Sequence, residues 1–161
     1  MRNILVARID DRLIHGQVVT SWIKAYPITV ILIIAKDLPK NILMQRIYKS
    51  VAPDGIEVKI MDNPGALAYL QENSRKSENI MIIVKTPNIL EFLVEHDIPL
   101  TTIILGGMGA KPGRETLIRN VSTNEAERES LRNLINKGIK IIYQMVPADK
   151  EIEVRKLLTK E

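Results

Sequence analysis

The chain has 161 residues, 45% of them hydrophobic, which suffices for one complete core and is too little for two ordinary domains. The 26% charged residues exclude a disordered chain, and no apolar run reaches the roughly 18 residues of a membrane span. Because there is no cysteine, disulfides are excluded and a cytoplasmic location is expected. A net charge of +4 with few aromatic residues argues against nucleic-acid binding.

Short apolar runs alternate with helical patterns, which is typical of βαβ units around a mainly parallel sheet. Six runs are apolar at nearly every position, as buried parallel strands are: Ile4–Ile9, Ile28–Ile34, Ile56–Met61, Ile80–Val84, Thr102–Leu105 and Ile139–Gln144. A further short strand is expected near Leu117–Val121. The sequence therefore predicts an α/β fold with an open sheet of six or seven strands in a single domain.

Two helices are predicted to pack on this sheet through apolar side chains with i,i+4 spacing. The first stripe comprises Val18, Val19, Trp22 and Ile23, and the second comprises Leu43, Ile47 and Val51. Each helix ends before a proline, at Pro27 and Pro53.

Later helix starts are indicated by capping residues. Asn63-Pro64 and Thr86-Pro87 each place a capping side chain before a proline at the first helical position. Ser122 with Glu125 has the spacing of a capping box. A last helix is expected to open at Asp149, with Val154 and Leu158 on one face.

The loop after the first strand is the most unusual segment, because ligands of open parallel sheets lie beyond the carboxyl ends of the strands. An extended chain places Arg8, Asp10 and Arg12 on one side, and His15 then lies at the entrance of the next helix. The backbone N–H groups of Gly16 and Gln17 and two guanidinium groups would converge on an anion beside an imidazole.

This arrangement suits a phosphate next to a nucleophile. An imidazole is largely neutral near pH 7, and its free nitrogen can attack phosphorus without an auxiliary base. Asp10 could fix the ring tautomer or hold an arginine in place. In the alternative interpretation, His15 and the arginines only cap a helix and pair with Asp10 and Asp11, and the residues alone leave both open.

Three other features carry weaker signals. His96 follows a helix and is interpreted as a solvated cation. The segment Gly106–Gly113 contains G-x-G but has Pro112 in place of the third glycine, so it is read as a flexible loop flanking the site or as a plain turn. Lys85-Thr86-Pro87 could face an anion or simply start a helix.

The loop resembles a known active-site segment. Residues 8–18, RIDDRLIHGQV, with Trp22, are similar to the IIB component of the mannose/sorbose-type bacterial sugar phosphotransferase system. The likeness extends through Ala52-Pro53, Lys85-Thr86-Pro87, Gly106-Gly107-Met108, Gly138 and Val146-Pro147-Ala148-Asp149. It implies a three-layer α/β/α fold, with residues 1–161 as one IIB domain and neither metal nor cofactor.

The resemblance also implies roles and partners. His15 matches the histidine that accepts phosphate from the IIA component and passes it to a sugar translocated by membrane components IIC and IID. Arg8, Asp10 and Arg12 match the residues around it, with Gly16, Gln17 and Arg12 as the expected phosphate-binding groups. The protein would then lie at the inner face of the cell membrane through its transporter partners, and self-association into a homo-oligomer is left open.

A signalling receiver domain phosphorylated on aspartate is the alternative from another class. Its ingredients occur in order: Asp10-Asp11, Asp62, Thr86 and Lys111-Pro112. The arginines beside Asp10-Asp11 would repel the Mg²⁺ that this chemistry requires, so the alternative ranks second.

Sequential partners must reach His15, so we expect it on an open, positive surface. Loops around residues 37–40, 85–88 and 106–114 should surround it, with Lys111 and Arg114 as docking charges.

Overall fold

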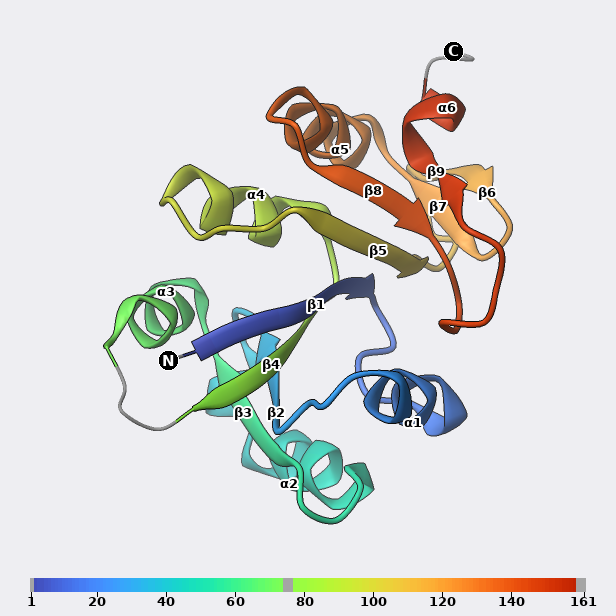
Figure 1. Ribbon diagram of the computed structural model, residues 1–161. Helices are drawn as coiled ribbons and strands as arrows, with labels where there is room; N and C mark the ends of the chain where they lie inside the picture. Colours follow the sequence, from blue (N-terminus) through green and yellow to red (C-terminus); the bar gives the residue numbers. More distant parts are fainter. Residues whose placement is uncertain (1, 74–76, 159–161) are drawn as a thin grey trace.

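The computed structural model describes residues 2–73 and 77–158, which form a seven-stranded sheet and a separate two-stranded hairpin (Figure 1). The sheet has the order β3-β2-β4-β1-β5-β8-β9. Its strands are β1 (Arg2–Asp10), β2 (Val30–Ile34), β3 (Glu57–Met61), β4 (Glu78–Val84), β5 (Thr102–Gly107), β8 (Lys140–Tyr143) and β9 (Ile152–Glu153). All neighbours pair in parallel except β9, which runs antiparallel to β8.

Helices cover both faces of the sheet, which confirms the three-layer α/β/α prediction (Figure 1). One face carries α1 (Gly16–Ala25) and α2 (Ile42–Val51), the latter preceded by a 3₁₀ turn at Leu38–Lys40. The other face carries α3 (Asn63–Gln71), α4 (Pro87–Glu95), α5 (Glu125–Asn136) and α6 (Val154–Leu158). No helix among the described residues is long and apolar enough to cross a membrane.

The core is built from strand residues that alternate between the two faces. In β2, Ile31 and Ile33 pack toward α1 and α2, while Val30, Leu32 and Ile34 join the cluster under the other helices. All five are at most 2% exposed. Burial on both sides explains why the strands are apolar at consecutive positions.

The expected strand at Leu117–Val121 is wrong in its extent. This segment spans the turn of a hairpin between β6 (Glu115–Ile118) and β7 (Val121–Thr123), where Asn120 has a φ of 67°. The seventh strand of the sheet is instead β9, only two residues long, which the sequence analysis did not predict.

Two helix starts differ from the prediction because a neighbouring residue provides the cap. Asp62, not Asn63, accepts a hydrogen bond from Gly65 N at 2.9 Å and caps α3. Asn124 and Glu127, not Ser122 and Glu125, form the capping box of α5. Ser122 belongs to β7, whose pairing with β6 keeps its backbone extended.

The remaining starts are confirmed in part. α4 begins at Pro87 after Thr86 as predicted, although the Thr86 side chain makes no capping bond to the backbone. The last helix begins at Val154 rather than Asp149, whose carboxylate accepts a hydrogen bond from Val146 N in the preceding turn. Val154 and Leu158 are buried on one face, as expected.

The two helices on the α1 face differ in how they use their apolar residues. α1 buries Val19 and Trp22, as predicted. α2 has no buried residue, and its stripe points outward, with Leu43 68% and Ile47 43% exposed. The prediction that this stripe packs on the sheet is wrong, because Met44 and Tyr48 occupy the inner side instead.

Candidate functional site

The loop between β1 and α1 lies at the carboxyl edge of the sheet and is anchored by its apolar residues. Leu13 and Ile14 are buried in the core under α1, at 1% and 6% exposure. Leu13 adopts a φ of 58° and Gly16 a φ of 42°, two left-handed positions that turn the chain sharply into the helix. His15 is therefore held between a buried anchor and the first turn of α1.

Asp10 is the centre of the polar site and is completely buried. Arg8 Nη2 donates to its Oδ2 at 3.2 Å, while Arg12 donates from Nε to Oδ1 and from Nη2 to Oδ2, both at 3.0 Å. The backbone N–H of Arg12 also donates to Oδ1. The structure thus brings both predicted arginines onto one carboxylate, which leaves one positive charge in excess.

The two arginines differ in their access to solvent. The side chain of Arg8 is 1% exposed, donates to the carbonyl of Gln144 and lies over the ring of Trp22, and its Nε has no hydrogen-bond partner among the described residues. Burial lowers the pKa of Arg8, against the attraction of Asp10. The side chain of Arg12 is 46% exposed, and its hydrogen bonds to Asp10 raise its pKa. Of these two arginines, only Arg12 is exposed enough to contact an anion that arrives from solvent.

His15 lies beside this cluster with its side chain 25% exposed. Its Nε2 is 3.9 Å from Asp10 Oδ2, is buried and has no hydrogen-bond partner in the described parts of the chain, whereas Nδ1 lies 3.2 Å from the carbonyl of Leu13. His15 is the N-cap of α1 but makes no side-chain capping bond. Gly16 and Gln17, the first residues of α1, are exposed, and their expected contact with a phosphate stays a prediction.

Two glycines at the end of β5 make room for the arginines. A Cβ at Gly106 would overlap the guanidinium group of Arg8, and one at Gly107 would lie 3.0 Å from Arg12 Nη2. These glycines were expected to belong to a flexible loop flanking the site or to a plain turn, and their role beside the arginines was missed. The signal was present in their position after an apolar strand, but their link to Arg8 depends on the strand order.

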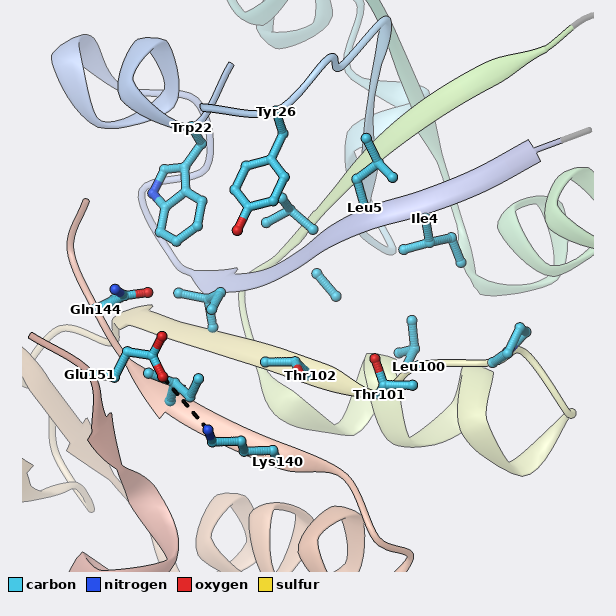
Figure 2. A pocket seen from close by; sticks show the side chains of 15 residues that line it. Ile4, Leu5, Trp22, Tyr26, Leu100, Thr101, Thr102, Lys140, Gln144 and Glu151 are labelled. Carbon is cyan, nitrogen blue, oxygen red and sulfur yellow. Dashed lines mark ion pairs between the residues drawn. The ribbon is translucent and has the colours of Figure 1, made fainter. Parts of the chain in front are cut away.

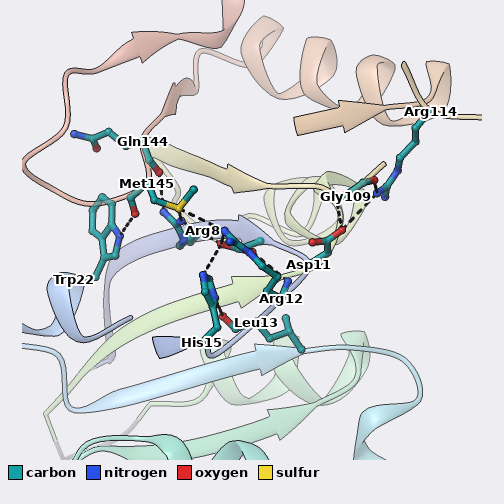
Figure 3. Close-up of polar contacts among 11 residues, drawn as sticks. Arg8, Asp11, Arg12, Leu13, His15, Trp22, Gly109, Arg114, Gln144 and Met145 are labelled. Carbon is teal, nitrogen blue, oxygen red and sulfur yellow. Dashed lines mark hydrogen bonds and ion pairs between the residues drawn. The ribbon is translucent and has the colours of Figure 1, made fainter. Parts of the chain in front are cut away.

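A second ionic cluster fixes the loop that follows these glycines. Arg114 donates from Nε to Glu127 Oε1 at 3.0 Å, from Nη2 to Oε2 at 2.7 Å and from Nη1 to the carbonyl of Gly109 at 2.8 Å. Asp11 accepts from Gly109 N and lies 3.5 Å from Arg114 (Figure 3). Because the side chain of Arg114 is 3% exposed, the expectation that it is a docking charge is wrong.

A cavity of about 370 Å³ lies on the sheet face between α1 and β8 (Figure 2). Trp22 and Gln144 line it, as do Lys140 and Glu151, which form an ion pair. Neither Arg12 nor His15 lines this cavity, which adjoins the polar site through Trp22 and Gln144, both contacts of Arg8.

The aspartates that the receiver alternative requires have other structural roles. Asp10 is covered by two arginines, Asp11 accepts a hydrogen bond from Gly109, and Asp62 caps α3. Each of these carboxylates therefore already has a structural partner. His96 is the exposed C-cap residue of α4, with Nδ1 2.8 Å from the carbonyl of Phe92 and its ring against the ring of Phe92.

Comparison with known proteins identifies the family of the chain. The family described as PTS system sorbose subfamily IIB component matches residues 4–161. The sorbose-specific EIIB component of Lacticaseibacillus casei is 32% identical over 94% of this chain and 92% of its own. The mannose-specific EIIAB component of Escherichia coli K12 is 28% identical over 96% of this chain and 48% of its own.

A solved structure is similar over almost the whole fold. The IIBSor domain of the sorbose permease from Klebsiella pneumoniae superimposes with a TM-score of 0.94 at 27% identity, covering 98% of this chain and 97% of that one. No comparison supports the receiver alternative. The chain therefore belongs to the sorbose-subfamily IIB components of sugar phosphotransferase systems.

Proposed function

We propose that His15 is a phosphoryl carrier, which accepts phosphate from a phosphohistidine of the IIA component and passes it to a sugar entering through IIC and IID. IIB components are phosphotransferases that work with IIA and IIC partners, which supports the frame of this proposal. The observation that carries the residue assignment is the place of His15, at an uncapped helix N-terminus beside two arginines on one carboxylate.

The transfer exchanges one bond to phosphorus for another. A nitrogen of His15 attacks the phosphorus atom of the donor, and the new N–P bond forms as the donor's N–P bond breaks. In the second transfer, a sugar hydroxyl attacks the phosphorus atom on His15, and an O–P bond forms as the N–P bond to His15 breaks. The hydroxyl proton passes to the imidazole nitrogen that is released. Both steps concentrate negative charge at the phosphoryl oxygens, which the exposed guanidinium of Arg12 and the N–H groups of Gly16 and Gln17 would stabilise.

The other polar residues act through Arg12 and His15. Asp10 holds the Arg12 guanidinium by two hydrogen bonds and faces Nε2 of His15. Arg8 is buried, so we assign it a positioning role, in which it neutralises and orients Asp10 from behind. One ring nitrogen is covered and the other contacts the Leu13 carbonyl, so the ring must turn when a donor arrives.

The proposal extends to the whole chain and its place in the cell. Residues 1–161 would form one IIB domain, held at the inner face of the membrane by IIC and IID. The relatives are named for different sugars, sorbose and mannose among them, so the proposed acceptor is a sugar without further specification.

Labelling from phospho-IIA tests the proposal. The chain contains two histidines, so His15→Ala is compared with His96→Ala as the matched control. The wild type and His96→Ala should take the label, which should survive alkali and hydroxylamine as a phosphohistidine does. His15→Ala should fold and take none. Labelling of His15→Ala, or a label removed by hydroxylamine, would overturn the assignment.

A further inference from the structure

The outer side of α2 carries an unusual concentration of exposed aliphatic side chains. Ile42 is 67% exposed, Leu43 68%, Ile47 43% and Val51 53%. Only Tyr26 and Ile152 are comparably exposed large hydrophobic residues in residues 2–73 and 77–158. A contiguous apolar surface of this kind marks a site of contact with another molecule.

The charged side chains on α2 and in the turn before it are all basic, whereas the exposed Asp37 and Asp54 lie just beyond the two ends of this segment. Residues 38–53 include Lys40, Arg46 and Lys49 and no aspartate or glutamate. All three cations are exposed, and none forms an ion pair within the described part of the chain. The complementary partner surface is therefore acidic around an apolar centre.

The start of α2 lies close to the proposed phosphoryl site. β2 is separated from β1 by one strand, so the carboxyl ends of the two strands are about 10 Å apart. Ile42 and Leu43 follow the loop that leaves β2 at this edge, and His15 follows β1 at the same edge. Leu38, just before α2, packs in the same cluster as Leu13 and Ile14 beside His15.

We propose that Ile42, Leu43 and Ile47, with Lys40 and Arg46, form an α2 docking surface for the IIA phosphoryl donor. An interface of about 800 Å² per partner has a radius of about 16 Å, so one centred on His15 would include the first half of α2. The stripe runs along α2, away from the sheet edge. A flat membrane facing His15 would touch only its start, which favours a protein that curves around the edge.

This inference rests on the proposed function. It is tested by comparing substitutions at two exposed aliphatic residues of α2, Leu43 and Val51. Leu43→Gln should lower kcat/KM for transfer from phospho-IIA about tenfold, because a docking contact is lost. The loss should reside in KM, with kcat unchanged. Val51→Gln, the matched control at the far end of the stripe, should change kcat/KM less than about twofold.

A small donor separates docking from chemistry. Phosphoramidate phosphorylates an imidazole directly, so it should label the wild type, Leu43→Gln and Val51→Gln at equal rates. Failure to label the wild type on His15 would refute the proposed function, whereas equal phosphoramidate labelling with an IIA-specific loss supports the docking surface.

Other results would assign the surface to a different occupant. Transfer from IIA at the wild-type rate in Leu43→Gln, or an equal loss in Val51→Gln, would overturn the proposal. If Leu43→Gln keeps the wild-type rate with IIA but sediments as a monomer where the wild type sediments as a dimer, the surface binds a second copy of the chain and the proposal is overturned. If Leu43→Gln loses only sugar phosphorylation in membranes, the surface binds a membrane component and the proposal is likewise overturned.

Discussion

The two ionic clusters beside β5 have opposite balances of charge and of hydrogen bonds. Around Asp10, two arginines share one carboxylate, and Arg8 Nε and His15 Nε2 have no hydrogen-bond partners in the described residues. Around Arg114, two carboxylates meet one guanidinium, and the bond to Glu127 is bidentate. The first cluster thus has an excess of positive charge and of hydrogen-bond donors. The second, in which the guanidinium group is paired with acceptors, is called the closed cluster.

This difference indicates separate roles. A cluster that is short of acceptors gains stability when an anion arrives, so it suits a transient phosphoryl group. A cluster whose guanidinium is paired on every side mainly holds its neighbours in place, here the loop at Gly109 and the start of α5. Substitutions in the first should change phosphoryl transfer, and those in the second should change stability.

Among substitutions of the residues that surround His15, the largest effect on transfer is expected from Arg12→Ala. Removal of the exposed guanidinium should slow phosphoryl transfer about 100-fold, because one donor to the developing charge is lost. The free energy of unfolding should fall by only about 1 kcal/mol, because the buried Asp10 carboxylate loses hydrogen bonds but keeps its ion pair with Arg8. Single-turnover transfer from phospho-IIA and urea denaturation measure the two quantities.

Two further variants sharpen this test. Arg12→Lys should restore the rate only in part, since lysine keeps the charge but loses the two-pronged geometry. Arg155→Ala, which removes an exposed arginine on α6, should leave the rate unchanged. An Arg12→Ala protein that is unfolded or fully active would contradict the assignment of Arg12 to the reaction.

An intermediate effect is expected from Gly106→Ala. The added methyl group meets the Arg8 guanidinium, which is buried and hydrogen-bonded on both sides and cannot move away. Overpacking should cost about 1–3 kcal/mol of stability, and displacement of Asp10 should slow transfer about tenfold. Gly107→Ala should do less, since Arg12 is half exposed and can shift. Equal effects of the two substitutions would show that Arg8 does not position the site.

Much of the site is local in sequence, which is why it could be predicted. Asp10, Arg12 and His15 lie within six residues, and strand period and helix entry are enough to place them together. Gly106 and Gln144 reach Arg8 from β5 and from the chain after β8. Their roles depend on strand order, which hydrophobic patterns do not encode.

The orientation of α2 shows a second limit. Leu43 and Ile47 have i,i+4 spacing, but so do Met44 and Tyr48, so the helix has two candidate apolar faces. Gln45 helps to select between them by donating to the carbonyls of Leu38 and Pro39, which fixes the rotation of the helix. Such a contact is visible only after the preceding turn has been placed.

The smallest effect on transfer is expected in the closed cluster, from Glu127→Gln. Burial alone would raise the pKa of Glu127, but hydrogen bonds from Arg114 and the Asn124 backbone outweigh it and lower the pKa. A lowered folded-state pKa contributes stability above the unfolded-state pKa, about 4.3, that is lost as the pH falls through the folded-state value. At pH 7 the substitution should cost about 2 kcal/mol, because Arg114 is left partly unpaired, and should change transfer less than about threefold.

Urea denaturation of the wild type and Glu127→Gln across pH tests the origin of that cost. The difference in free energy of unfolding should be largest near pH 7 and should shrink below about pH 4.3, since the wild-type carboxylate then becomes neutral like the amide. Arg114→Ala should be destabilised at pH 7 as well, because it leaves Glu127 without its bidentate partner. A difference that stays constant from neutral to acid pH would mean that shape, not charge, holds this cluster. A loss of transfer as large as that of Arg12→Ala would erase the distinction between the two clusters.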